Sequence, residues 1–288
     1  GEQHPTTLEA MQQLGITYRH LGEYQKAKDL EVFILDSWIR LFGPDHPATL
    51  RTMGHLALTL SDLGDSVEAR DLQAIVLKKQ ITLLGEDHVE TVTAMGNLAA
   101  RYYQLGDFVK AKELGVTRTK LLGEDHPDTL LAMGNLAGAY SELGDFERAK
   151  KITATVLEKR LILLGEDHPD TLMAMGDLAA IHIELKDFQK AKELQVMVLE
   201  KRTHLLGKAH LETVKAMANL AVTYYNLDQL TKAEELEVTV LEKRRQLLGN
   251  QHPDTIDTMQ DVAATYHALG KLREAQELEQ LVHQIQKL

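Results

Sequence analysis

The sequence has no cysteine, 6 prolines in 288 residues, and only 5% aromatic residues. Without cysteine there is neither a disulfide framework nor a thiolate metal site. The chain also shows no signal-peptide pattern and no apolar run long enough to cross a bilayer. We therefore expect a soluble, intracellular protein of the cytoplasm with no membrane partner.

Basic residues are also fewer than acidic ones. The chain has 32 Lys and Arg against 43 Asp and Glu, which gives a formal net charge of −11 at pH 7. A nucleic-acid partner would have to bind against this overall field, and no Lys/Arg stripe with interleaved aromatic residues is found. We therefore expect no nucleic-acid partner. No run of alternating β-branched residues bounded by turn residues predicts a strand either.

One pattern fills the chain instead, and it is clearest in the stretch from Leu121 to Phe146. Seven histidines mark it, spaced by 42 residues except for one gap of 38, and they are His4, His46, His88, His126, His168, His210 and His252. Such a period with two helices per unit is typical of an α-solenoid, in which each repeat contacts mainly its neighbours. We predict an all-α, right-handed α-solenoid that forms a single superhelical domain over residues 1–288. Its seven helix-turn-helix repeats are 1–42, 43–84, 85–122, 123–164, 165–206, 207–248 and 249–288.

Four more positions hold one residue type in every repeat. They are a Thr three residues after the His, a Met after seven, a Leu after seventeen and an Ala after twenty-three. The Met position has helical spacing relative to the other apolar residues, which predicts packing between repeats by an adaptable side chain. The small Ala predicts the point where helices cross.

The first helix of each repeat follows from apolar residues at positions 4, 7, 10, 11, 14 and 17 after the His, which form one helical stripe. We expect it to begin at the Asp-His-Pro-Asp-Thr segment, residues 125–129 in the fourth repeat, where Asp, His or Thr can cap free amides. It ends at Leu-Gly-Asp, where Gly accepts a positive φ. Lys186 and Asp228 replace this Gly in two repeats, so their turns should be more strained.

The second helix of each repeat runs from an aromatic position, such as Phe108, through the repeated Ala to a Leu-Leu pair closed by Gly. In the third repeat this helix (Val109 to Leu122) is four residues short. In the last repeat Gln280 and His283 replace apolar residues of the other repeats. We therefore expect a C-terminal capping repeat, since a terminal repeat needs a polar outer face.

The run from Asn97 to Ala111, Asn-Leu-Ala-x-x-Tyr-x-x-Leu-Gly-Asp-Phe-x-x-Ala, resembles the tetratricopeptide repeat. The longer, 42-residue form is similar to the repeats of kinesin light chains and to the repeat arms of fungal and bacterial signalling NTPases. This resemblance implies a non-enzymatic protein-protein interaction scaffold. Its partner, a protein or peptide segment, would bind in a concave groove lined by the first helix of each repeat. The Lys/Asn/Arg set with which some such domains clamp a C-terminal carboxylate is not reproduced.

Transferring the groove positions of that family gives a set of polar and aromatic candidates for partner binding. They are Arg51, His55, Asn97, Tyr103, Gln104, Asn135, Asp177, Lys215, Asn219, Tyr225 and Asn226. Glu142 and Glu184 lie on the same face. Amide side chains both donate and accept, so Asn97, Asn135 and Asn219 are the expected anchors for a bound backbone. The alternative is that each Asn bonds within its own repeat.

Glycines 54, 96, 134, 138 and 176 lie inside first helices, where each costs about 0.5–1 kcal/mol relative to Ala. Two explanations are open. The more common one is close crossing of helices, and the other is close approach by a bound segment.

Catalytic and metal sites find no support in the pattern. Equivalent histidines in a solenoid are separated by a helix pair, on the order of 10 Å, whereas zinc ligands stand about 2 Å from one ion. The chain has four serines and none accompanies the Asp-His pairs at a fixed spacing. We expect a non-enzyme without cofactor or metal, whose histidines either cap helices or form hydrogen bonds between repeats. The alternative function is a self-associating or sensing repeat arm of a larger signalling NTPase, with contacts through the array ends. The chain starts on a repeat boundary, which favours a segment of a longer protein.

Overall fold

The computed structural model describes residue 1, residues 3–123, residue 126 and residues 128–287. All regular secondary structure in that part of the chain is α-helical, which confirms the all-α prediction of seven helical-hairpin repeats. The chain divides into two compact units, Gly1–Asp145 and Phe146–Leu288. The right-handed sense and the single-domain organisation remain predictions.

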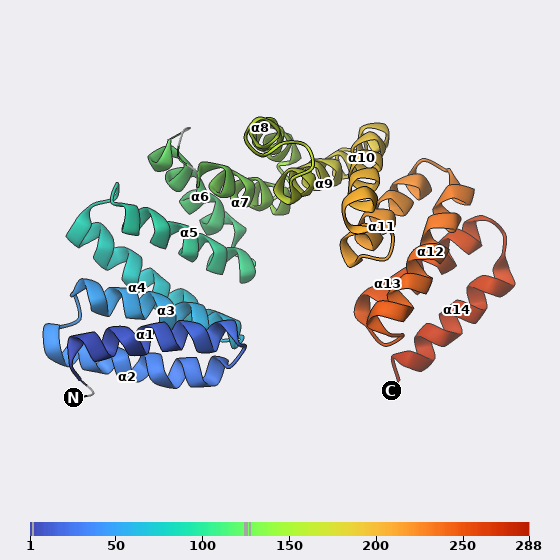
Figure 1. The fold of residues 1–288 in the computed structure, drawn as a ribbon. Coiled ribbons are helices and arrows are strands. Elements are labelled where there is room, and N and C mark those ends of the chain that lie inside the picture. The colour runs from blue at the N-terminus through green and yellow to red at the C-terminus, as the bar shows by residue number, and fades with distance from the viewer. Residues whose placement is uncertain (2, 124–125, 127, 288) are drawn as a thin grey trace. The chain divides into compact units, whose positions relative to one another are not determined.

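Each unit contains seven of the fourteen described helices, labelled in Figure 1. The first unit contains α1 (Pro5–His20), α2 (Tyr24–Phe42), α3 (Pro47–Asp62), α4 (Ser66–Leu84), α5 (Val89–Gln104), α6 (Phe108–Leu122) and α7 (Thr129–Glu142). The second contains α8 (Phe146–Leu164), α9 (Pro169–Glu184), α10 (Phe188–Leu206), α11 (Leu211–Asn226), α12 (Leu230–Leu248), α13 (Pro253–Ala268) and α14 (Leu272–Ile285). Within each unit every helix packs against the next one in sequence.

The repeated histidines begin the first helices, as expected. In all seven repeats the His Nδ1 accepts a hydrogen bond from the backbone N–H two residues later, at 3.0 to 3.4 Å. This bond satisfies one of the amides that a helix start leaves free. Of the predicted capping segment in the fourth repeat, Asp125 and Pro127 lie outside the described residues. No group of three or more His, Cys, Asp or Glu that could hold a metal ion occurs among the residues described.

The repeated threonines have a role that the sequence did not indicate. Six of the seven are buried, and the hydroxyls of four donate to carbonyls near the end of the preceding second helix, whereas those of Thr91 and Thr255 are buried without a partner. Thr49 bonds the Gly43 carbonyl at 2.8 Å, and Thr213 bonds the Arg202 carbonyl at 3.2 Å. In these four repeats the Thr therefore ties one repeat to the next.

The turn inside each repeat is a left-handed helix end. Gly22, for example, has a φ of 75°, and the Glu23 N–H bonds the Tyr18 carbonyl at 2.9 Å. Lys186 and Asp228 keep the same turn with φ values of 60° and 58°. The predicted strain is thus present, at about 1–2 kcal/mol for a residue with a Cβ.

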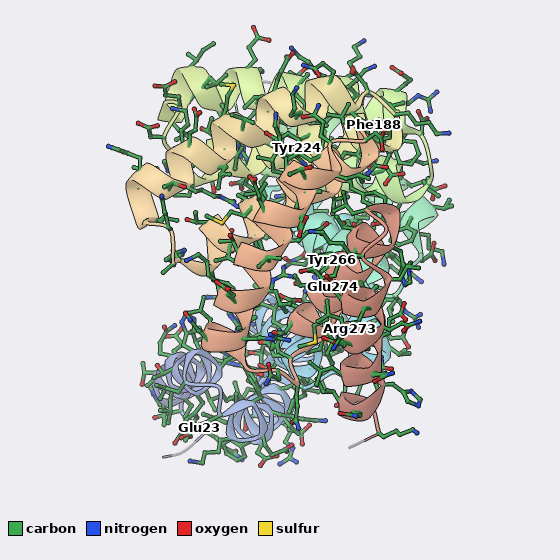
Figure 2. The ribbon with its side chains drawn as sticks, turned by 90° about the vertical axis from the view of Figure 1, so that its right-hand side faces the viewer. Glu23, Phe188, Tyr224, Tyr266, Arg273 and Glu274 are labelled. Carbon is green, nitrogen blue, oxygen red and sulfur yellow. The ribbon has the colours of Figure 1, made fainter. Side chains whose placement is uncertain are left out.

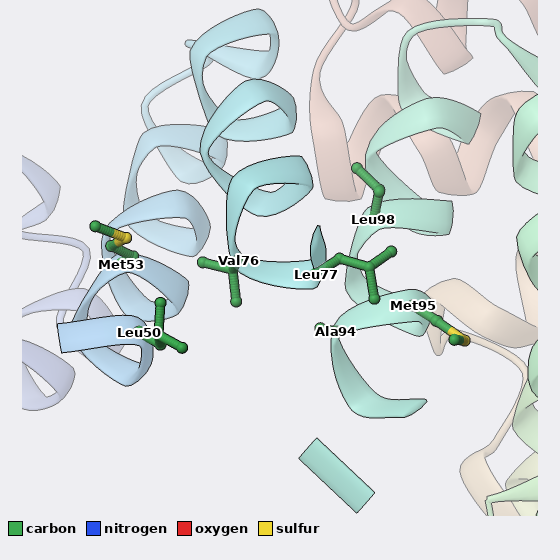
Figure 3. Close-up of a cluster of buried hydrophobic side chains, with 7 residues drawn as sticks. All are labelled: Leu50, Met53, Val76, Leu77, Ala94, Met95 and Leu98. Carbon is green, nitrogen blue, oxygen red and sulfur yellow. The ribbon is translucent and has the colours of Figure 1, made fainter. Parts of the chain in front are cut away.

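The core is built from the repeated apolar positions. Every repeated Ala of the second helices is buried, which confirms the crossing point. Figure 3 shows one cluster, in which α3, α4 and α5 contribute side chains to a common interior. Its members are Leu50, Met53, Val76, Leu77, Ala94, Met95 and Leu98. Two of the repeated methionines, Met53 and Met95, belong to this cluster, as predicted.

Tyrosines near the ends of first helices pack beside the turn into the second helix. Tyr224 and Tyr266, both labelled in Figure 2, lie under the ammonium groups of Lys232 and Lys271, with Nζ 5.4 and 5.5 Å from the ring centroids. This cation–π contact occupies one face of each ring. These tyrosines therefore stabilise the hairpins of the second unit.

Two further expectations concern helix length and the chain's end. The helix α6 has 15 residues, whereas α4 and α8 have 19, so the third repeat is short as predicted. On α14, Gln280 and His283 are exposed, which agrees with a polar final face. Among the described helices, none is both long and apolar enough to cross a membrane.

Candidate partner-binding groove

In the first unit, the structure gathers six of the predicted groove residues around two neighbouring cavities. Arg51 and His55 on α3 and Asn97 on α5 line a cavity of about 250 Å³, the α3–α5 hollow. The other three, on α5 and α7, line a cavity of about 360 Å³, the α5–α7 pocket. They are Tyr103, Gln104 and Asn135. The helix α5 contributes to both cavities.

In the second unit, the predicted residues lie on the exposed face of two first helices. Asp177 lies on α9, and the other four lie on α11. Those four are Lys215, Asn219, Tyr225 and Asn226. Each side chain is exposed, and none lines a cavity described in this unit.

Several candidates already make bonds within the chain. The Tyr103 hydroxyl donates to the Glu142 carboxylate at 3.1 Å, and the Gln104 side-chain carbonyl accepts from Ser61 at 3.3 Å. The Asn226 amide donates to the carbonyl of Val222 in its own helix at 2.8 Å. These bonds fix side-chain orientation, and Asn226 is thereby the least suited of the asparagines to act as an anchor.

The three anchor asparagines are different. Within the described part of the chain, the side chains of Asn97, Asn135 and Asn219 make no hydrogen bond. Asn97 is half-buried, and the other two are exposed. Asn is a mediocre helix former, and here no hydrogen bond within the repeat offsets its low helix propensity. Their donors and acceptors remain available to a ligand.

Partial removal from water shifts the pKa values of two titratable candidates: His55, which is half-buried, and Asp177, which is exposed as a whole residue but whose carboxyl lies near the neighbouring helices. Burial lowers the pKa of His55, and the nearby positive charges of Arg19 and Arg51 lower it further, so this His is neutral at pH 7. Partial removal from water raises the pKa of the Asp177 carboxyl, against the opposing attraction of Arg160 and Arg202. The groove thus offers a neutral ring in one unit and a crowded carboxylate in the other.

The glycines inside first helices divide into two groups. At Gly54, Gly134 and Gly176, an added Cβ would meet no atom within 4 Å, so helix crossing does not explain them. At Gly96 it would lie 2.8 Å from the Arg118 guanidinium, and at Gly138 it would lie 3.6 Å from the Tyr103 ring. Packing is therefore the wrong explanation for Gly54, Gly134 and Gly176. It does not require glycine at Gly138 either, since 3.6 Å is an ordinary van der Waals contact, so packing accounts for Gly96 alone.

A set of arginines near the ends of second helices was not identified from the sequence. Arg160, Arg202 and Arg244 stand eight residues before a repeated His, and each donates from Nη1 to a carbonyl in the first turn of the next first helix, at 2.7 to 3.0 Å. Arg118 occupies the equivalent position on α6 and lines the α5–α7 pocket. The signal was present in the spacing to the His, but Trp38 and Gln80 at this position in the first two repeats hide it.

Comparisons with known proteins identify the repeat. The Tetratricopeptide repeat family model matches residues 7–48, 49–90, 91–128, 129–170 and 171–212, and a second model with the same description matches residues 212–287. No curated protein sequence matches the chain.

Several solved structures have a similar fold. One is a putative kinesin light chain with nearly identical repeats from Podosopora anserina, at 24% identity and a TM-score of 0.65, with 70% of this chain and 97% of that chain covered. Another is a signal transduction ATPase with a tetratricopeptide repeat sensor from Pyrococcus horikoshii, at 15% identity and a TM-score of 0.71, with 98% of this chain and 42% of that chain covered. The repeat array is typical of protein-protein interaction scaffolds, and repeats of this kind generally bind proteins or peptides. With matches over nearly its whole length, the chain belongs to the tetratricopeptide repeat family.

Proposed function

We propose that this protein is a non-enzymatic scaffold that binds an extended or helical segment of a partner protein along the face of its first helices. One observation carries the proposal: the amides of Asn97, Asn135 and Asn219 occupy one position of the repeat and make no bond to the rest of the described chain. An amide offers both a donor and an acceptor, so it can pair with the backbone of a segment of any sequence.

Other groups on the same face would add affinity and register. Tyr103 and Tyr225 are 37% and 40% exposed, which leaves aromatic surface for contact. Arg51 and Lys215 are exposed cations in an acidic protein and would select an acidic residue of the partner. The open space beside Gly54, Gly134 and Gly176 would let the partner's backbone approach the helices.

The alternative function, a sensing or self-associating arm of a larger signalling NTPase, stays a prediction. The similarity to the Pyrococcus horikoshii protein supports it in fold only. Finding a nucleotide-binding domain in the same polypeptide would favour it. A single continuous array over residues 1–288 is part of the proposal in either case.

The test begins with 15-residue peptides selected from a random library against the whole chain. The triple variant Asn97→Ala, Asn135→Ala, Asn219→Ala should then weaken the selected peptides about 100-fold, since three hydrogen bonds contribute about 1 kcal/mol each. The same substitutions should not lower the melting temperature, because Ala is the better helix former.

Asn250→Ala is the matched control, since Asn250 is exposed in a loop away from the first helices. Its affinity for the peptides should equal that of the wild type. Unchanged affinity in the triple variant together with a lower melting temperature would assign the asparagines a structural role and reject the proposal.

A further inference from the structure

The α5–α7 pocket contains a buried cation without a hydrogen-bond partner. Arg118 is only 8% exposed, and its Nε is buried without a partner. No hydrogen bond or ion pair joins its guanidinium to another residue of the described chain. The Asp128 carboxylate attracts it from beyond bonding distance, while burial lowers the pKa of the guanidinium. An Arg remains charged even so, and a buried charge without a partner is costly.

The Nε of Arg244 also lacks a partner, but each equivalent arginine bonds through Nη1, so a guanidinium without any hydrogen bond to the described chain is particular to the third repeat among them. Arg160, Arg202 and Arg244 each reach the first turn of the following helix. Arg118 instead lies against the backbone of Gly96, where any Cβ would collide with its guanidinium. Gly96 therefore makes room for the Arg118 head group at the pocket.

The remaining pocket wall is apolar and made of small residues. Ala99 and Ala100 on α5, Ala111 and Gly115 on α6, and Ala132 and Leu136 on α7 contribute to it. Arg118 is the one charged residue among the described lining residues. The volume of about 360 Å³ lies near the lower end of the ~300–1,000 Å³ in which proteins enclose small ligands.

Charge and shape together specify one class of ligand. The planar guanidinium fork matches a carboxylate, to which it can donate two parallel hydrogen bonds. The wall of Ala, Gly and Leu side chains matches an apolar body. At the rim, the Asn135 amide and the Gln104 side chain add polar groups, while the nearby Glu142 carboxylate already accepts the Tyr103 hydroxyl.

We propose that the α5–α7 pocket binds a small organic carboxylate with an apolar body, whose carboxylate pairs with Arg118 and whose body packs on Ala99, Ala100 and Leu136. The proposal does not depend on a peptide in the groove. Because the pocket shares Tyr103, Gln104 and Asn135 with the proposed groove, an occupied pocket would change the surface that a partner meets. The site would then make partner binding responsive to a small anion.

The test uses isothermal titration of the whole chain at pH 7 with three probes of one shape: 3-phenylpropanoate, 3-phenylpropanamide and 3-phenylpropylamine. The acid should bind. The neutral amide and the cation should bind at least about tenfold more weakly, because only the carboxylate can form charge-assisted hydrogen bonds with Arg118. Equal binding of acid and amide would overturn the proposal.

Three variants separate the charge from the cavity. Arg118→Met should weaken the acid at least about tenfold. Gly96→Ala keeps the charge but displaces the guanidinium, so it should also weaken binding of the acid. Gly134→Leu fills the pocket from an open position and should abolish binding without loss of stability. Lys120→Met, which removes an exposed charge from the same helix, is the control and should change nothing. Undiminished binding in the Arg118 and Gly134 variants would overturn the site.

A peptide with a C-terminal Phe, as the free acid and as the amide, distinguishes the source of the carboxylate. If only the peptide acid binds and the free 3-phenylpropanoate does not, the small-molecule site is wrong. The Asn triple variant should keep its affinity for 3-phenylpropanoate to within about threefold, because Asn135 lies at the rim and makes at most one neutral bond. The groove proposal and this one can therefore fail independently.

Discussion

The third and sixth repeats share most of their repeated residues but differ in how their second helices meet the next repeat. Both have the His cap, the Ala crossing, and a Lys over the ring of a first-helix Tyr, at 5.0 Å in the third repeat and 5.4 Å in the sixth. Four residues after the Ala, however, the third repeat has Gly115 where the sixth has Glu237. Eight residues before the next repeated His, both have an Arg, but Arg118 makes no hydrogen bond to the described chain whereas Arg244 makes two.

Because of these differences, the Arg at this position has a different role in each repeat. In the sixth repeat, Arg244 donates to the Asp254 carbonyl at 2.7 Å and to the Thr258 hydroxyl at 2.6 Å, which joins α12 to α13. In the third repeat, Gly115 lets α6 approach Leu136 of α7 closely, since a Cβ there would stand 3.2 Å from the Leu136 side chain. The contact between α6 and α7 is then apolar. Arg118 does not take part in it and lines the α5–α7 pocket instead.

The largest expected effect compares the two arginines directly. Arg244→Met should lower the free energy of unfolding by about 4 kcal/mol, since it removes two hydrogen bonds from a charged donor at about 1.5–3 kcal/mol each. Arg118→Met removes none and should change stability by less than about 1 kcal/mol, or raise it, because an unpaired buried charge is removed. Urea denaturation of both variants measures the difference. Equal losses would show that Arg118 is structural after all.

The second prediction concerns Glu237, the buried carboxyl that occupies in the sixth repeat the position of Gly115 in the third. Burial raises the pKa of Glu237 to about 7, although the nearby Thr265 hydroxyl lowers it. Because the folded-state pKa is above the ordinary value of 4.5, the contribution of this group to stability is greatest below about pH 4.5, falls as the pH rises to about 7, and is constant above that.

Glu237→Gln should therefore unfold at the same urea concentration as the wild type near pH 4.5 and be more stable at pH 8, by up to about 3 kcal/mol. Gln73 and Gln195 already occupy this position in the second and fifth repeats, so the substitution fits the scaffold. Glu235→Gln, at an exposed carboxyl two residues before this site on the same helix, should leave the pH dependence unchanged. A variant whose stability follows the wild-type pH profile would contradict the buried-acid interpretation.

Periodicity explains what could be predicted from the sequence. The His caps, the Ala crossings and the left-handed turns recur in every repeat, so each prediction rested on seven instances of one local interaction. Lys186 and Asp228 were recognisable as strained because the other repeats have Gly at that position. Helix α6 was recognisably short for the same reason.

The features outside that periodicity were harder to predict. Whether an Arg bonds the next helix or lies against Gly96 depends on a choice between two side-chain conformations that no spacing encodes. The glycines were ambiguous because helix packing and open space select the same residue, and only the folded structure distinguishes Gly54 from Gly96. The unbonded state of Asn97, Asn135 and Asn219 is likewise a property of the assembled repeats.

The most direct measurement of the central claim is site-specific photo-cross-linking with a library-selected peptide. A benzophenone amino acid would replace Tyr103 in the third repeat or Tyr225 in the sixth, both at the same position of the first helix, and Leu83 or Leu163 on second helices as controls. All four side chains are exposed, between 37% and 69%, so accessibility does not decide the result. Groove binding predicts cross-links from the first-helix positions and none from Leu83 or Leu163. Cross-links confined to the second-helix positions would contradict it.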